Sequence, residues 1–350
     1  MRKSVFLVAL SVLSSVFAAA PEIDQDSVSM VQGGDRKVTI TYELNAAPFI
    51  VTVDIQTNAN ASAGKDDPGW VSIGEEHFRD VTGDVNLLIK TAGTKHIYWN
   101  PVNNFSNVVA KTCRAKVTAW APDAPPDYLV VDLRRDNNRQ ATDPRVRYYV
   151  STNAFPEADN VQDDLYRTDY MAMRLIKARG KTFRMGSPTS ESGHETDETL
   201  HLVTFTNADF YAAVYPMTIG QALNFAKWFK GDDTGILDLQ LDGGSGYGNT
   251  CLYQNQTVAN QATSGYQTNH VAVCCKYHNA RGTSDWPNGG HAVESTSLCG
   301  IMRTRTDVDF DLPTEAQWEF FARAGTSSSR YADNVNDIAW HETNNPDGLG

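Results

Sequence analysis

The sequence has little positive charge for its length. Its 350 residues include 30 lysines and arginines against 42 aspartates and glutamates, which gives a net charge of −12. We find no stripe of basic residues that would overcome this balance. Because proteins bind phosphate backbones through clustered Lys and Arg side chains, the composition argues against nucleic acid as a partner.

Long apolar runs are missing after the first twenty residues. No later segment reaches the ~18 apolar residues of a membrane-spanning helix, so no transmembrane segment is expected. At the N-terminus, two basic residues precede an apolar stretch from Val5 to Leu13, and small residues end at Ala20. This order is typical of a secretory signal peptide, which we assign to residues 1–20, with cleavage after Ala18. The mature protein is expected to be exported to the periplasm, the cell surface or the extracellular space.

Cysteine is scarce, and the chain has only Cys113, Cys251, Cys274, Cys275 and Cys299. In an oxidising compartment one or two pairs could be bridged, with at least one thiol left over. The sequence leaves the connectivity open. Cys274 and Cys275 lie near His278, but zinc sites usually separate their cysteines by two to four residues. We therefore favour an interpretation of this segment without metal.

Short alternating apolar runs fill the first half of the chain. The runs are KVTITYEL, FIVTVDIQ, CRAKVTAW, YLVVDL and RVRYYV, and Gly, Asn, Asp and Pro separate them. Period-two alternation between such turn residues predicts antiparallel strands. We therefore predict an all-β antiparallel sandwich over residues 22–151. It shows no catalytic constellation, and its tryptophans Trp70, Trp99 and Trp120 are interpreted as packing residues rather than a binding face.

The remainder of the chain has a different pattern. Residues 152–169 are polar, follow neither period and are interpreted as a linker. Residues 170–350 mix short strands, capped helices and long loops. His194, Glu195 and His201 could suggest a metal site, and a solvated acidic loop is the favoured alternative.

Two helices in this second half have clear start signals. Thr218 is followed three residues later by Gln221, and Thr314 by Gln317, which is the capping-box pattern. In the second of these helices, the segment 318–322 places Trp318, Phe321 and Ala322 on one expected apolar face. Glu319 and Arg323 are spaced for an ion pair.

Four motifs, in this order, resemble the formylglycine-generating enzyme or sulfatase-modifying factor family. They are Phe183-Arg-Met-Gly-Ser187, Glu198-x-x-His201, Phe210-Tyr211 with Tyr215-x-Met217-Thr218-x-x-Gln221, and LPTEAQWEFFARAG at 312–325. The resemblance covers about Ala172 to Gly350. It implies a C-type-lectin-like α+β domain over residues 170–350 that is incomplete at its C-terminus, with the last helix backing small sheets.

The resemblance also implies a chemistry. Family enzymes oxidise a sulfatase cysteine to formylglycine with oxygen and a copper ion held by two cysteines. Those cysteines follow a tryptophan-rich run, and the chain ends at NNPDGLG without it. No catalytic residue is carried over, copper is expected only in a complete family enzyme, and the 350-residue chain is expected to be non-catalytic.

Other functions stay open. If the gene continues past Gly350, the protein would be a cysteine-oxidising oxidoreductase. It could otherwise be a lectin-like module that binds a protein or a glycan, or a truncated product without a stable second domain. The sequence does not choose among these by itself.

Family members also hold structural calcium through side-chain and backbone oxygens, which suit a hard cation. The resemblance makes Asp337, Ile338, Asp347 and Leu349 candidate calcium ligands, with Asn334-Val335 as an alternative to Asp337-Ile338. Leu349 departs from the family's aromatic residue, although a backbone carbonyl would serve equally. The favoured alternative is an acidic, asparagine-rich loop that holds no ion.

Overall fold

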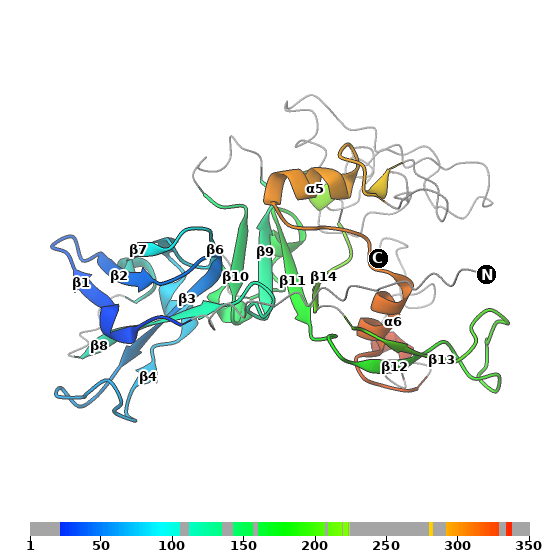
Figure 1. The fold of residues 1–350 in the computed structure, drawn as a ribbon, viewed down its shortest axis with the longest axis horizontal. Helices are drawn as coiled ribbons and strands as arrows, with labels where there is room; N and C mark the ends of the chain where they lie inside the picture. The colour runs from blue at the N-terminus through cyan, green and yellow to red at the C-terminus, as the bar shows by residue number, and fades with distance from the viewer. Residues whose placement is uncertain are drawn as a thin grey trace, which may run out of the picture.

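The computed structural model describes residues 22–105, 112–134, 143–156, 160–206, 209–218, 220–222, 224, 280–282, 292–328 and 334–337. The predicted signal peptide lies outside this part of the chain. The described part is mostly β-sheet with few helices. Along the long axis of Figure 1, a sandwich lies at one end, a four-stranded sheet in the middle, and a two-stranded sheet with one helix at the other end.

The N-terminal strands form two sheets. The first has the order β1-β2-β7-β5, built from β1 (Ser29–Gln32), β2 (Val38–Leu44), β7 (Gly93–Trp99) and β5 (Val81–Gly83). In the second, β3 (Phe49–Thr57) pairs along one edge with β8 (Cys113–Trp120) and along the other with β6 (Leu87–Ile89) and β4 (Val71–Ser72). Every one of these pairings is antiparallel. One short helical turn, η1 (Gln25–Ser27), precedes β1, and two more, η2 (Glu75–Phe78) and α1 (Pro101–Asn104), lie in connections between strands.

One hydrophobic core joins these two sheets. Alternate residues of β2, β3 and β8 point into it, as the period-two pattern predicts, and Ile40 and Tyr42 are completely buried. All buried members of this core lie between Ile23 and Ala119. The sandwich therefore closes its core with strands that end at Trp120.

The last two strands expected in the sandwich belong to the middle sheet. β9 (Tyr128–Asp132) pairs with β10 (Val146–Tyr149) on one side and with β11 (Tyr170–Ile176) on the other. β14 (Phe210–Ala213) completes an antiparallel sheet of order β10-β9-β11-β14. The prediction that both strands form part of a sandwich reaching residue 151 is wrong, because alternation identifies a strand and its buried face but not its partner strand.

The segment interpreted as a linker is packed against this middle sheet. It contains two short turns, η4 (Thr152–Ala154) and η5 (Asp164–Arg167). Phe155 and Tyr166 are completely buried and cluster with Tyr149 and Tyr170. The ring centroids of Phe155 and Tyr166 lie 5.0 Å apart. These aromatic side chains make the segment a cover of the sheet rather than a free connection.

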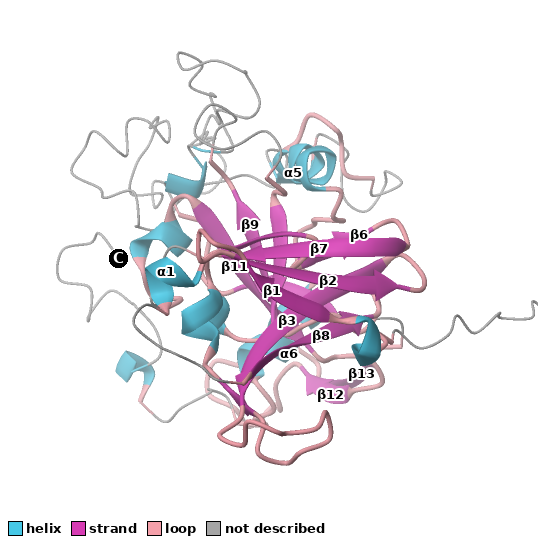
Figure 2. Cartoon of the chain, turned by 90° about the vertical axis from the view of Figure 1, so that its left-hand side faces the viewer, coloured by secondary structure: helices cyan, strands magenta, loops and turns pink. Residues whose placement is uncertain are grey.

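The opposite face of the middle sheet is covered by α5 (Leu298–Thr306), as Figures 1 and 2 show. The helix begins at Ser297, whose hydroxyl accepts a hydrogen bond from the amide of Gly300 at 3.2 Å. It ends at Asp307, which adopts the left-handed conformation. Its buried Met302 packs on Leu129 and Val131 of β9. The middle sheet is thus covered on both faces.

At the far end, β12 (Thr182–Met185) and β13 (His201–Thr204) form an antiparallel pair backed by α6 (Glu315–Arg323). The predicted capping box is present, since Thr314 and Gln317 each accept a hydrogen bond from the other's amide. A last turn, η6 (Val335–Asp337), follows.

The predicted apolar face of α6 is wrong. Trp318 is 57% exposed, and Ala322 is exposed as well. Phe320 makes the contact instead, with ring centroids 5.3 Å from Phe183 and 5.0 Å from Phe205. The helix is too short and too evenly apolar for spacing alone to select the packed side.

Candidate functional site

The turn after β12 joins the first family motif to the last. Gly186 donates its amide to the carboxylate of Glu319 at 2.9 Å, and its carbonyl accepts from Arg323 at 2.9 Å. Arg323 also pairs with Glu319 at 2.7 Å, as their spacing predicts. Both side chains are largely buried, so the pair holds two segments together instead of lying in solvent.

A Ser-His-Glu cluster lies beside this turn. Ser187 Oγ is 2.7 Å from Nδ1 of His194 and donates to Glu198 at 2.9 Å. The Ser187 hydrogen bond holds the pKa of Glu198 below its ordinary value. In a catalytic triad the histidine stands between the serine and the carboxylate, whereas here the serine stands between them. The hydroxyl proton is directed at a weak base, so this cluster fixes the loop and does not activate a nucleophile.

The capping-box residues Thr218 and Gln221 lie in a group of buried side chains that hold backbone in place. Gln221 accepts the amide of Thr218 at 3.1 Å and donates to the carbonyls of Tyr166 and Tyr170 at 3.2 and 3.0 Å. Asn224 donates to the carbonyl of Thr168 at 3.0 Å. These buried amides fix the turn η5 and the start of β11.

The residues considered for metals are mostly not brought together. His201 Nδ1 lies 2.7 Å from the carbonyl oxygen of Thr199. The described residues contain no group of three or more His, Cys, Asp or Glu side chains arranged to hold a metal ion. Of the candidate calcium ligands, Asp337 is exposed in η6, while Ile338, Asp347 and Leu349 lie outside the described residues.

Two of the five cysteines are described, and neither forms a disulfide. Cys113 begins β8, and burial raises the pKa of its thiol. Cys299 is buried in α5. Cys251, Cys274 and Cys275 lie outside the described residues.

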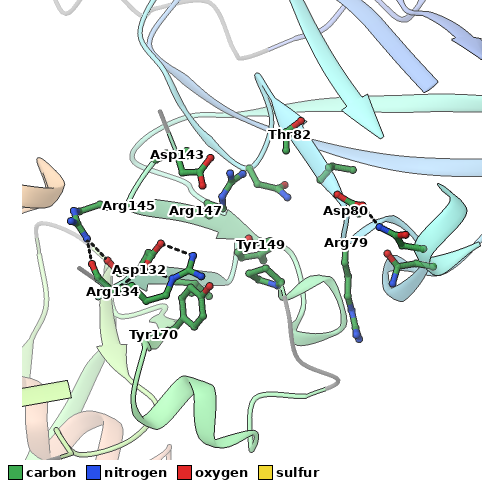
Figure 3. Close-up of a pocket in the computed structure, with 17 residues that line it drawn as sticks. Arg79, Asp80, Thr82, Asp132, Arg134, Asp143, Arg145, Arg147, Tyr149 and Tyr170 are labelled. Carbon is green, nitrogen blue, oxygen red and sulfur yellow. Dashed lines mark hydrogen bonds and ion pairs between the residues drawn. The ribbon is translucent and has the colours of Figure 1, made fainter. Parts of the chain in front are cut away.

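A polar pocket of about 530 Å³ lies where the sandwich meets the middle sheet (Figure 3). One face of three strands forms its floor. Arg147 of β10 stands opposite Val130 of β9, and Asp132 of β9 stands opposite Tyr170 of β11. The sandwich supplies the other wall, which includes Arg79, Asp80, Val81, Thr82, Asn86, Asn103 and Asn104.

Three charged residues of the floor, Asp132, Arg134 and Arg145, are bonded to one another and form a frame. Arg134 pairs with Asp132 at 3.0 Å, and its guanidinium lies 5.0 Å from the ring centroid of Tyr170. Arg145 donates to the backbone carbonyls of Asp132 and Arg134, at 3.0 Å each. Arg147 stands apart from this frame, and within the described residues its side chain has no hydrogen bond or ion pair.

Contacts across the junction hold both walls in place. Arg79 donates to the carbonyl of Asn153 at 2.8 Å, and the carbonyl of Asn86 accepts the amide of Tyr148 at 2.7 Å. Ser151 donates to Glu75. Burial raises the pKa of Glu75. The pocket is therefore bounded by two surfaces that are bonded to each other.

Sequence reasoning missed this pocket. Its residues come from both sides of a junction that no motif marks. One signal was available in the run RVRYYV, where Arg145 and Arg147 occupy alternate positions of a predicted strand. Two arginines on the same face of a strand indicate that the face meets a polar space rather than a core.

Comparison with known proteins identifies the second part of the chain. The family model of the sulfatase-modifying factor enzyme 1-like domain matches residues 161–348, more than half of the chain. The chain belongs to the sulfatase-modifying factor family. Neither the curated proteins nor the solved structures contain a match to it.

Most of the pocket lies outside the matched range. Of the residues that line the pocket, Tyr170 lies inside the matched range and the others precede it.

Among the described residues, no helix has the length and apolar character to cross a membrane.

Proposed function

We propose that this family member is an exported binding protein whose sulfatase-modifying factor domain supports a ligand pocket and does not oxidise a cysteine. The observation that carries the proposal is the 530 Å³ pocket at the junction between the sandwich and the middle sheet. Small-molecule sites have volumes of about 300–1,000 Å³. A pocket of this size, built from two bonded walls, is suited to a small polar ligand.

The state of the motif residues supports a role in scaffolding. Ser187 and Glu198 bind each other, Gln221 binds backbone carbonyls, and Arg323 binds Gly186. Groups that are engaged in these internal hydrogen bonds are not available to move protons or hold a substrate. The two described cysteines lie in different parts of Figure 1, in β8 and α5, so they do not form a pair.

Export is supported by the N-terminal order of basic, apolar and small residues. The expected mature N-terminus is Ala19. Mass spectrometry of secreted material checks this, and recovery of protein that still begins at Met1 would contradict it.

The binding function is tested by thermal unfolding in the presence of small polar compounds. The compounds are neutral sugars, sugar acids and sugar phosphates. We expect at least one class to raise the Tm of the wild-type chain, because a ligand that binds only the folded state stabilises it. Thr82→Trp places a large ring at the exposed pocket wall and should abolish the shift.

Thr94→Trp, on β7 and away from the pocket, is the matched control and should retain the shift. If no compound class stabilises the wild type, or if Thr82→Trp leaves the shift intact, the pocket is not the binding site and the proposal fails.

Cysteine oxidation is the second candidate function, and the family match over residues 161–348 favours it. The test incubates the chain with copper(I), oxygen and a peptide carrying the target cysteine, followed by mass spectrometry for the aldehyde. We expect no aldehyde. Turnover that disappears in Cys274→Ser or Cys275→Ser would overturn the non-catalytic proposal and place the active site at that pair.

A further inference from the structure

We propose that the pocket binds a sugar acid, a small ligand with one carboxylate and several hydroxyl groups, and that Arg147 binds the carboxylate. This inference rests on the proposed binding function and names the ligand class for the same pocket. Four observations carry it: the position of Arg147, the engagement of the neighbouring arginines, the balance of the other charges in the pocket, and the polar groups on the facing wall.

The strand β10 directs Arg147 into the pocket. Val146 and Tyr148, on either side of it, pack on the opposite face of the sheet in the core beneath α5. Arg147 therefore shares the pocket face with Tyr149, two residues further on. Figure 3 shows its side chain standing over the floor between Asp143 and Thr82. The strand pairing fixes this direction, since Arg147 lies in register with Val130 of β9.

The guanidinium of Arg147 has bonding capacity to spare. It is half-buried, and within the described residues it has neither a hydrogen bond nor an ion pair. Arg134 and Arg145, by contrast, are held by Asp132 and by backbone carbonyls. A partly desolvated charge without a partner is unfavourable. A carboxylate is a suitable partner, because it matches the planar fork of donors in a bidentate pair.

The other charges in the pocket balance one another, so Arg147 supplies its one positive charge in excess. The lining contains four arginines and three aspartates, the latter being Asp80, Asp132 and Asp143. A carboxylate monoanion would balance that charge, whereas a phosphate dianion would add a further negative charge next to the three aspartate carboxylates. Oxygens of this kind also accept hydrogen bonds from hydroxyl groups.

The facing wall offers further partners for hydroxyl groups. The side chains of Asn86, Asn104 and Thr82 line the pocket and make no hydrogen bond within the described part of the chain. Each can both donate and accept. A ligand with hydroxyl groups next to its carboxylate would satisfy this wall and Arg147 together.

The test measures binding by isothermal titration calorimetry to the full mature chain. Glucuronate is compared with glucose, which lacks the carboxylate, and with glucose 6-phosphate, which carries a dianion. We expect glucuronate to bind about tenfold more tightly than either, because glucose lacks the charge-assisted bidentate pair and glucose 6-phosphate brings a second negative charge that the lining does not balance. Raising the ionic strength should weaken glucuronate binding.

Variants then assign the carboxylate to Arg147. Arg147→Ala should weaken glucuronate binding by about tenfold or more and remove most of the preference for glucuronate over glucose. Arg147→Lys should retain part of the preference, since it keeps the charge but loses the fork. Arg174→Ala removes an exposed arginine of the same sheet that does not line the pocket, and it should behave as the wild type.

The outcomes separate this inference from the proposed function. Suppose that a sugar binds and that Thr82→Trp abolishes its binding. If glucuronate is then not preferred, or if Arg147→Ala does not weaken its binding, the ligand class is overturned and the binding function stays intact. Tighter binding of the phosphate would also overturn the ligand class. If none of the three sugars binds, or if Thr82→Trp leaves all binding intact, both the ligand class and the proposed binding function are overturned.

Discussion

Gly186 has a φ of 90°, and a Cβ added there would lie 2.6 Å from the carbonyl oxygen of Glu198 and 2.8 Å from that of Thr199. The position excludes a side chain for two reasons, the left-handed backbone and the close approach of the opposite loop. Gly180 has only the first, with a φ of 73° and nothing within 4 Å of an added Cβ. A substitution at Gly180 therefore tests backbone strain alone, whereas the same substitution at Gly186 tests strain and steric contact together.

We predict that Gly186→Ala destabilises the fold by about 3 kcal/mol, because strain and contact act together. Gly180→Ala should cost only about 1–2 kcal/mol, the strain alone. Urea unfolding of the three proteins measures both free energies. Equal losses at the two positions would show that the loop moves aside for the added methyl group.

Glu198 makes stability depend on pH. Its pKa is lowered from the ordinary 4.5, first by the Ser187 hydrogen bond and then by the amide of Glu195. A carboxylate with a lower pKa in the folded state stabilises the fold above the unfolded pKa and loses this contribution as the pH falls through the folded value.

The wild type should accordingly be more stable than Glu198→Gln at pH 7, and the difference should shrink as the pH falls below about 4.5. Chemical unfolding at a series of pH values tests this. A stability difference that stays constant from pH 7 to pH 3 would exclude the carboxylate as the cause.

Among the elements, α6 shows how a correctly predicted helix can pack on an unexpected side. Its capping box and its Glu319–Arg323 pair are both present as predicted. The side of the helix that is packed is set by the aromatic pair Phe183 and Phe205, which lie on and next to the small sheet. Phe320 packs against both rings, whereas Trp318 is left 57% exposed.

Phe320→Ala is expected to cost about 2 kcal/mol, roughly half the loss for a fully buried phenylalanine. Trp318→Ala should change the stability by less than about 0.5 kcal/mol, as exposed substitutions usually do. Thermal and urea unfolding of the pair measure the contrast. A larger loss for Trp318 would restore the apolar face predicted from spacing.

For the whole molecule, the boundary between the two parts is decided by strand pairing. The sandwich core is complete by Ala119, whereas β9 and β10 belong to a sheet that also needs β11 and β14. A fragment that ends after β10 carries β9 with one edge unpaired. Unpaired strand edges of this kind favour association between chains.

We predict that fragment 22–125 unfolds in one cooperative transition and is monomeric. Fragment 22–151 should contain the same folded sandwich but self-associate through the exposed edge of β9. Calorimetry and size-exclusion chromatography with light scattering test both statements. A monomeric, cooperatively folded 22–151 fragment would show instead that β9 and β10 are stable without β11.

The local features of this protein could be read from the sequence, because each depends on neighbouring residues. The inward faces of β2 and β3, the two capping boxes and the ion pair of α6 all follow from spacing along the chain. The order of the family motifs likewise indicated the family that the match over residues 161–348 shows.

Only the tertiary structure decided which strands pair, which side of α6 is buried and where the pocket lies. These depend on residues far apart in the sequence that the fold brings together, such as Arg147 and Thr82 around one pocket, or Gly186 and Glu319 in a hydrogen bond. A strand with one apolar face can join any sheet that offers an open edge, and its sequence does not name that edge. The pocket exists because β9 and β10 pair in the middle sheet and not in the sandwich. This pairing places the charged face of β10 opposite the sandwich wall.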